Sequence, residues 1–298
     1  MATQINALAH RYSAALYSCT YAICVVMLAL FVNHSSVAQP SNCSVSDDIQ
    51  LQVNRMLGAA SRIDYRGTLL VEYGKDREFI AVNSAQAQGE ASLLRLNKAS
   101  AQAVETVRIL PMDPHSACSL SPFYAFSVDM EQRVAGRSTV RLAVRPRDTL
   151  RLGYAMDIDA QTGVPLRVVT VTPEGQVLER FEFAQFEVLG PAQQVIVEKS
   201  TVGAPDFTFA ALPPGFQVVA EGNEPTPHRV LSDGLASVSV FIEHQPQALS
   251  AGEGVALRGS TLAYTRGTPD HHLITVMGEV PITTARLLAD AVRTPNNQ

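Results

Sequence analysis

The stretch VPLRVVTVTPEGQVLERFEFAQFEV, from Val164 to Val188, decides the fold of this chain. Two runs rich in β-branched and aromatic residues flank the tripeptide Pro173–Gly175. Apolar and polar residues that alternate with a period of two on both sides of a turn predict an antiparallel hairpin. The chain is therefore expected to contain an antiparallel sheet.

Further strand-like runs surround this hairpin. They are YRGTLLVEY (65–73), REFIAVNSA (77–85), RVAGRSTVRLAVRPRD (133–148) and LRLGYAMDID (150–159). Before them, Ile49, Val53, Met56 and Leu57 recur at helical spacing after Ser46, a typical N-cap residue. Five or more antiparallel strands and one early helix predict an α+β domain in which an open, curled sheet encloses an apolar interior.

A second, smaller α+β domain is expected at residues 217–298. Residues 203–216, GAPDFTFAALPPGF, are rich in Pro and Gly, which predicts a linker between the two domains. Several strand-like runs follow, and the apolar residues of TTARLLADAV (283–292) share one helical face. The first domain then covers residues 39–202, within which residues 85–116 have no clear assignment.

The first 38 residues have the pattern of a secretory signal peptide. Arg11 precedes the apolar run Tyr21–Val32, and the small residues Ser36–Ala38 follow. The run of 12 residues is shorter than the roughly 20 that a membrane span needs, although an uncleaved anchor is the alternative. Cleavage predicts export and leaves Cys43 and Cys118, which are expected either to form a disulfide or to stay as two free thiols.

Composition and motifs favour binding over catalysis. The formal charge is −5, Trp is absent and aromatic residues make up 6%, which argues against nucleic-acid binding. The sequence has no phosphate-binding glycine loop, no nucleophile elbow and no metal-ligand spacing, so no cofactor and no metal are expected. Asp157 and Asp159 share a strand face and could serve a hydrolase, but a turn role for Asp159 and solvation of Asp157 explain them as well.

One local cluster of positive charge stands out in this acidic chain. It consists of Arg137, Arg141, Arg145, Arg147 and Arg151. All five residue numbers are odd, so on one unbroken strand these arginine side chains would lie on the same face. Guanidinium groups bind phosphate and carboxylate groups well. The cluster is expected to bind phosphorylated lipid headgroups or an acidic partner, or else to form a solvated face with local ion pairs.

The segment SDGLASVSVFIEHQ, Ser232 to Gln245, predicts a turn and then a strand. Its alternation assigns one face to the core. The other face carries Leu235, Ser237, Ser239 and Phe241 and is a candidate partner-binding surface, which an edge strand would offer by strand addition. The alternative is an ordinary strand packed by the terminal helix.

Several segments, in this order, resemble the periplasmic MucB/RseB family. They are YRGTLLVEY, RVAGR, RPRD followed by RLGY (145–154), DAQTGVPLRV and VLERFEFAQF in the first domain, and LPPGF, SDGLASVSVFIE, AYTRG and VMGEVP in the second. The resemblance covers most of residues 60–292, whereas residues 85–116 match poorly.

The resemblance implies a regulator rather than an enzyme. Members of this family restrain the sigma-E/AlgU envelope stress response by binding the periplasmic part of an anti-sigma factor of the MucA/RseA type and shielding it from proteolysis. It further implies a LolA/LolB-like open half-barrel covered by helices, release by lipopolysaccharide or another lipid, periplasmic localisation and homo-oligomers. A lipid or lipoprotein carrier is the alternative function.

Overall fold

The computed structural model describes residues 43, 45–59, 61–86, 92–95, 116–192, 204–246 and 252–294. The chain forms two units, Met1–Cys43 and Ser44–Gln298, and every helix and strand described below lies in the second. The predicted signal peptide and most of residues 87–115 lie outside the described residues. None of the described helices is long and apolar enough to cross a membrane.

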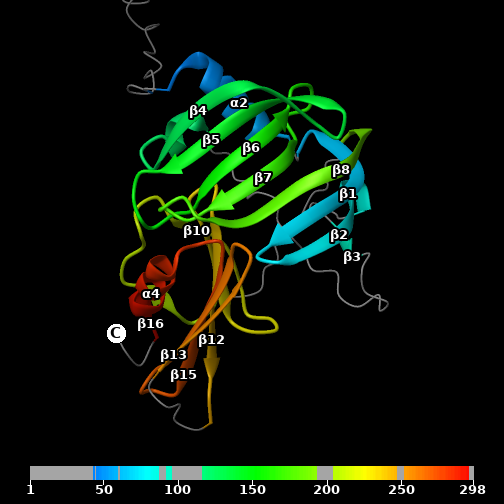
Figure 1. Ribbon diagram of the computed structural model, residues 1–298. Helices are drawn as coiled ribbons and strands as arrows, with labels where there is room; N and C mark the ends of the chain where they lie inside the picture. Colours follow the sequence, from blue (N-terminus) through cyan, green and yellow to red (C-terminus); the bar gives the residue numbers. More distant parts are fainter. Residues whose placement is uncertain are drawn as a thin grey trace, which may run out of the picture. The chain divides into compact units, whose positions relative to one another are not determined.

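The first sheet has eight antiparallel strands in the order β3-β2-β1-β8-β7-β6-β5-β4 (Figure 1). Their bounds are β1 Ile63–Tyr73, β2 Asp76–Asn83, β3 Ser92–Arg95, β4 Tyr124–Val134, β5 Arg137–Pro146, β6 Gly153–Asp159, β7 Pro165–Val171 and β8 Val177–Pro191. Because β3 and β4 do not pair with each other, the sheet is open, as predicted. The hairpin at 164–188 forms β7 and β8, and Gly175 at its tip has the positive φ of 87° that favours glycine.

Helix α2, Asp47–Leu57, covers one face of this sheet. Its buried residues Val53 and Met56 belong to a cluster with Leu142, Met156 and Ile158 from β5 and β6. This is the apolar stripe that the helical spacing predicts. Two short helices complete the first part of the chain, η1 at Ser84–Gln86 and α3 at Ala117–Leu120.

The second sheet has six antiparallel strands in the order β10-β11-β12-β15-β14-β13. Their bounds are β10 Gln217–Gly222, β11 His228–Ser232, β12 Ser237–His244, β13 Glu253–Arg258, β14 Thr261–Gly267 and β15 His272–Gly278. Helix α4, Ile282–Ala291, buries Leu288 and Ala289 in a core that also contains Val238 and Val240 of β12.

The predicted linker is built into this second core. Phe207 and Phe216 are buried among its residues. Strand β9, Thr208–Phe209, pairs with β16, Val292–Arg293, directly after α4. Residues 204–216 are therefore held on the second sheet, because two aromatic side chains and one short strand pairing fix them there.

Candidate functional site

The turn of the SDGLASVSVFIE segment joins the two sheets. Within the turn, the Asp233 carboxylate accepts hydrogen bonds from the backbone N–H groups of Leu235 (3.0 Å) and Ala236 (2.8 Å). Its other oxygen accepts from Arg151 Nε (2.6 Å) and from the Tyr124 hydroxyl (2.8 Å), both of which belong to the first part of the chain. The predicted turn is thus real, and it also anchors the second sheet to the first.

Arg151 is a structural residue of this junction and not a surface ligand for phosphate. Its side chain is completely buried and lies over the rings of Phe123 (4.5 Å to the centroid) and Phe216 (5.3 Å). It also donates to Asp148 and to the Pro214 carbonyl. A buried guanidinium with these partners has no face for a lipid headgroup, so the predicted lipid-binding role of Arg151 is wrong.

The remaining arginines do not gather into one site either. Arg137 donates to Asp159 (2.7 Å) and Arg141 to Asp157 (2.8 Å), while Arg145 is exposed further along β5. Burial disfavours the charged form of Asp159, but hydrogen bonds from Arg137 and Thr162 outweigh this effect and lower its pKa. Asp159 with its lowered pKa has no proton to donate near neutral pH, and Asp157 is engaged in an ion pair with Arg141, which weakens the hydrolase interpretation.

Arg147 lies outside the strand face, in the loop after β5. It donates to the backbone carbonyls of Ser121 (2.9 Å) and Tyr124 (3.3 Å). The break at Pro146 separates it from the face of Arg141, so the nominal alternation of odd residues does not hold beyond β5.

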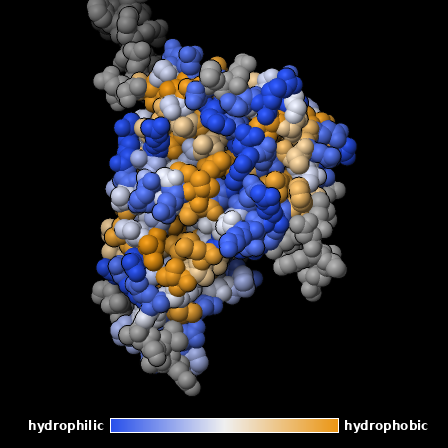
Figure 2. Space-filling model, viewed as in Figure 1, coloured by the Kyte–Doolittle hydropathy of each residue, from blue (hydrophilic) through white to orange (hydrophobic). Residues whose placement is uncertain are grey.

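Arg141 belongs to a row of alternating charges that crosses five strands. Arg167 of β7 donates both to Asp157 of β6 (2.8 Å) and to Glu182 of β8 (2.8 Å), and its hydrogen bond to Glu182 is the largest cause that lowers the pKa of Glu182. In Figure 2, hydrophilic residues form a band where Figure 1 draws β7 and β8. Paired across the strands from β4 to β8, the row is Asp129, Arg141, Asp157, Arg167 and Glu182. The local ion pairs match the alternative expectation for this face, but Asp157 is only 1% exposed, so the expectation that it is solvated is wrong.

The predicted partner-binding residues fall into two groups. Leu235 is buried in the same cluster as Tyr124 and Leu152 of the first part of the chain, so it offers no surface to a partner. Ser237, Ser239 and Phe241 are half-buried on the other face of β12 from Val238 and Val240. That part of the surface stays a prediction.

Strand β12 has no free edge. It pairs with β11 on one side and with β15 on the other. The expectation that this strand accepts a partner peptide by strand addition is therefore wrong, because β11 pairs with residues 237–241 on one side and β15 pairs with residues 238–244 on the other.

A second contact between the sheets brings the carboxylate of Glu179, on β8, close to that of Glu279, which follows β15. Glu179 of β8 accepts from the N–H (2.9 Å) and the hydroxyl (2.7 Å) of Ser260, in the β13–β14 turn. Burial and then the charge of Glu179 raise the pKa of Glu279 to about 7. Gly259 makes the approach possible, because a Cβ there would lie 2.5 Å from a Glu179 oxygen.

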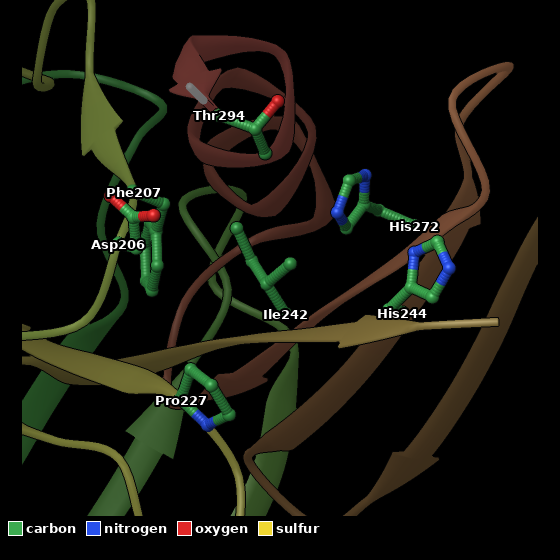
Figure 3. A pocket seen from close by; sticks show the side chains of 7 residues that line it. All are labelled: Asp206, Phe207, Pro227, Ile242, His244, His272 and Thr294. Carbon is green, nitrogen blue, oxygen red and sulfur yellow. The ribbon is translucent and has the colours of Figure 1, made fainter. Parts of the chain in front are cut away.

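A pocket of about 330 Å³ lies at the other end of the second sheet (Figure 3). His272 points into it, and its Nδ1 is 3.0 Å from Asp270, while the His244 ring lies 5.4 Å away. Among the described residues, no group of three or more His, Cys, Asp or Glu side chains could hold a metal ion. The full lining is Asp206, Phe207, Pro227, Ile242, His244, His272 and Thr294. The sequence did not link His244 to His272, because 28 residues separate them and only the pairing of β12 with β15 brings them together.

Cys43 and Cys118 are each disulfide-bonded. That they pair with each other stays a prediction.

Comparisons with known proteins identify the family. The MucB/RseB N-terminal domain model matches residues 81–201, and the MucB/RseB C-terminal domain model matches residues 201–293. The chain is 32% identical over 208 residues to the sigma factor AlgU regulatory protein MucB of Pseudomonas aeruginosa, covering 62% of this chain and 66% of that protein. It is 28% identical over 195 residues to the sigma-E factor regulatory protein RseB of Escherichia coli K12, covering 58% and 60%. The match spans less than two thirds of either relative.

Two solved structures are similar over most of the chain. A crystal structure of MucB has a TM-score of 0.64 and 28% identity, and the match covers 84% of this chain and 98% of that one. The complex of Pseudomonas aeruginosa MucA/MucB has a TM-score of 0.63 and 27% identity, covering 83% and 99%. The models of both MucB/RseB domains match this chain, the N-terminal domain before the C-terminal one. The chain therefore belongs to the MucB/RseB family.

Proposed function

We propose that this protein is a periplasmic regulator that binds the periplasmic region of a membrane-spanning anti-sigma factor. By holding that region, it protects the anti-sigma factor from regulated proteolysis and restrains a sigma-E/AlgU-type envelope stress response. No part of this function requires an enzyme.

One observation carries the proposal. The chain is similar over 83% of its length to MucB in the structure of the MucA/MucB complex and in that of MucB in complex with MucA(peri). The relatives are named as sigma factor regulatory proteins. The ion pairs of Asp159 with Arg137 and of Asp157 with Arg141 support the same conclusion, because both carboxylates of the candidate acid–base pair are engaged in structural contacts.

A direct binding measurement tests the proposal. The purified chain from Gln39 onward is titrated with the periplasmic segment of the cognate anti-sigma factor in a calorimeter. Saturable binding at micromolar concentration or below is expected, and the absence of binding would overturn the proposal. A second assay follows cleavage of that segment by the first protease of the cascade, which the bound protein should slow.

Release by a lipid is the regulatory part of the proposal. A lipid that binds the partner-free protein must lower partner affinity by the same factor by which the partner lowers lipid affinity. Titrating each ligand in the presence of the other measures both factors. An unchanged partner Kd at saturating lipopolysaccharide would remove lipid sensing and leave anti-sigma binding intact.

The carrier function has less support. A carrier needs only the first sheet, yet that sheet's buried residues depend on the second part of the chain. Leu235 belongs to the first cluster, and Asp233 is the partner of the buried Arg151. Truncation after Pro213 should therefore unfold or destabilise the first sheet, whereas an independent carrier domain would keep its melting temperature and its transport activity.

A further inference from the structure

Strand β13, Glu253–Arg258, has no strand on its outer side among the described residues, although its end residues have side-chain partners: Arg286 donates to Glu253, and Arg258 donates to Tyr73 and Glu78. It is the last strand in the order, and all six of its residues are exposed. Its pairing with β14 runs without a bulge from Glu253↔Arg266 to Arg258↔Thr261. A flat, regular edge of this kind presents a row of unused backbone N–H and C=O groups, which is the template for strand addition.

The hairpin geometry shows which backbone groups point outward. Arg258 and Thr261 pair directly across the two-residue turn of Gly259 and Ser260, and Gly259 has a φ of +60°. In such a hairpin the pair that flanks the turn is hydrogen-bonded, and hydrogen-bonded pairs then alternate along the ladder. The N–H groups of Val255 and Leu257 therefore point away from β14, toward the free edge.

The side chains of the same two residues form an apolar surface. Val255 is 49% exposed and Leu257 is 66% exposed, although their cross-strand partners Tyr264 and Leu262 are buried in the core. The core-facing side of the sheet thus continues onto β13 without cover. On helix α4, Leu287 is also an exposed apolar side chain, with 45% of its surface exposed. Figure 2 shows hydrophobic residues over the region in which Figure 1 draws α4 and the neighbouring strands.

The opposite edge of the sheet lacks these properties. Strand β10 has a bulge at which Val219 is left without a partner between Val218 and Ala220. Bulges blunt an edge and disfavour pairing with another chain. Of the two edges of this six-stranded sheet, β13 is therefore the one suited to a partner strand.

We propose that β13 binds an extended segment of the anti-sigma partner as an added β-strand, with alternate apolar side chains of that segment covering Val255 and Leu257. This inference rests on the proposed function and assigns a surface to it. A second copy of the chain is the less suitable occupant. A six-residue edge with two apolar side chains is much smaller than the roughly 1,200 Å² that stable protein interfaces bury. A peptide that is also held elsewhere needs only local pairing here.

The test compares two substitutions at one position. Val255→Pro removes the outward N–H group, and its neighbour Gly254 tolerates a following proline because it has no Cβ to clash with the ring. Val255→Ala removes most of the apolar surface and keeps the N–H group. Val219→Pro, at the bulge of β10, is the matched control. Each variant is titrated with the periplasmic segment of the anti-sigma factor, and melting temperatures verify that it is folded.

The expected result is that Val255→Pro weakens binding about fivefold to twelvefold, because one lost backbone hydrogen bond is worth about 1–1.5 kcal/mol. Val255→Ala should weaken binding less than Val255→Pro does, because it loses apolar contact but keeps the N–H group, and Val219→Pro should change Kd by less than about twofold. In hydrogen exchange of the wild-type complex, which needs no variant, the amides of Val255 and Leu257 should gain protection.

The other outcomes are distinguishable. Unchanged binding by Val255→Pro, with no protection of these amides, overturns the assignment of β13 and leaves the proposed function standing. Absence of binding by the wild-type protein overturns both. If light scattering instead shows a dimer of the free protein that Val255→Pro dissociates, the occupant is a second copy and the assignment to the anti-sigma segment is wrong.

Discussion

Arg151 Nε lies 2.6 Å from Asp233 Oδ2, and both side chains are completely buried. Eighty-two residues of chain separate them, and the pair connects the loop after β5 to the turn before β12. The Tyr124 hydroxyl donates to the same carboxylate oxygen. The junction between the two sheets is therefore a charged, hydrogen-bonded contact with aromatic rings around it, and it fixes the turn of the family's most recognisable segment.

Removing the cation from this pair is expected to destabilise the protein strongly. Arg151→Ala leaves the Asp233 carboxylate buried without its charge partner, and the free energy of unfolding should fall by about 3–5 kcal/mol. Urea unfolding measures the change. Arg145→Ala, at an exposed position on β5, is the control and should lie within about 0.5 kcal/mol of wild type. Equal effects of the two substitutions would contradict the structural role of Arg151.

Substitution of Leu235 is expected to affect mainly stability, whereas substitution of Phe241 is expected to affect mainly binding. Leu235→Ala creates a cavity in the buried cluster of the first sheet and should cost about 2–4 kcal/mol of stability. Phe241 is half-buried, so Phe241→Ala should lower the melting temperature less than Leu235→Ala and weaken anti-sigma binding more. Melting curves and calorimetric titration of both variants check this. The reverse ranking would mean that the outer face of β12 is structural only.

Asp157 is the central carboxylate of the row of charges that runs from Asp129 to Glu182, and its loss should lower the stability of the protein. Asp157→Asn leaves Arg141 and Arg167 facing each other without the anion between them, and about 1–3 kcal/mol of stability should be lost because Asp157 is buried. The exposed pair Arg66–Glu187 is the comparison: Glu187→Gln should leave the stability nearly unchanged. A small loss at Asp157, equal to that at Glu187, would show that the row is only a surface feature.

The pKa of Glu279, raised to about 7 from 4.5, predicts a pH dependence. Because the folded protein binds this proton more tightly than the unfolded chain, stability is fully present below about pH 4.5 and falls as the pH rises through 7. The groups that face Glu279 are the Glu179 carboxylate, which disfavours its charge, the Ser260 hydroxyl and the buried Tyr154 hydroxyl.

Glu279→Gln removes the titrating group. Between pH 5 and pH 8, the wild-type protein should lose roughly 2 kcal/mol more unfolding free energy than the variant does. Urea unfolding at the two pH values measures the difference. Glu243→Gln, at the exposed end of β12, should keep the wild-type dependence. If Glu279→Gln keeps it as well, the proton is bound elsewhere.

The sequence by itself determined the local elements of this protein. The hairpin at 164–188, the helix that buries Val53 and Met56, and the core face of β12 all follow from periodicity, because side-chain direction repeats every two residues in a strand and every 3.6 in a helix. The ordered segments that resemble the MucB/RseB family also came from the sequence, and the family comparisons confirm them. Strand β4 was not predicted, and its pairing with β5 became visible only in the fold.

Tertiary structure decided which of these elements are free to act. Alternation shows that a strand has two faces, but it does not reveal how many neighbours the strand has, so β12 could not be recognised as internal or β13 as an edge. Nor does it reveal distant partners. Leu235 enters the core of the other sheet, and Arg151 meets Asp233 instead of solvent. These contacts join residues far apart in the chain, and only the folded arrangement brings them together.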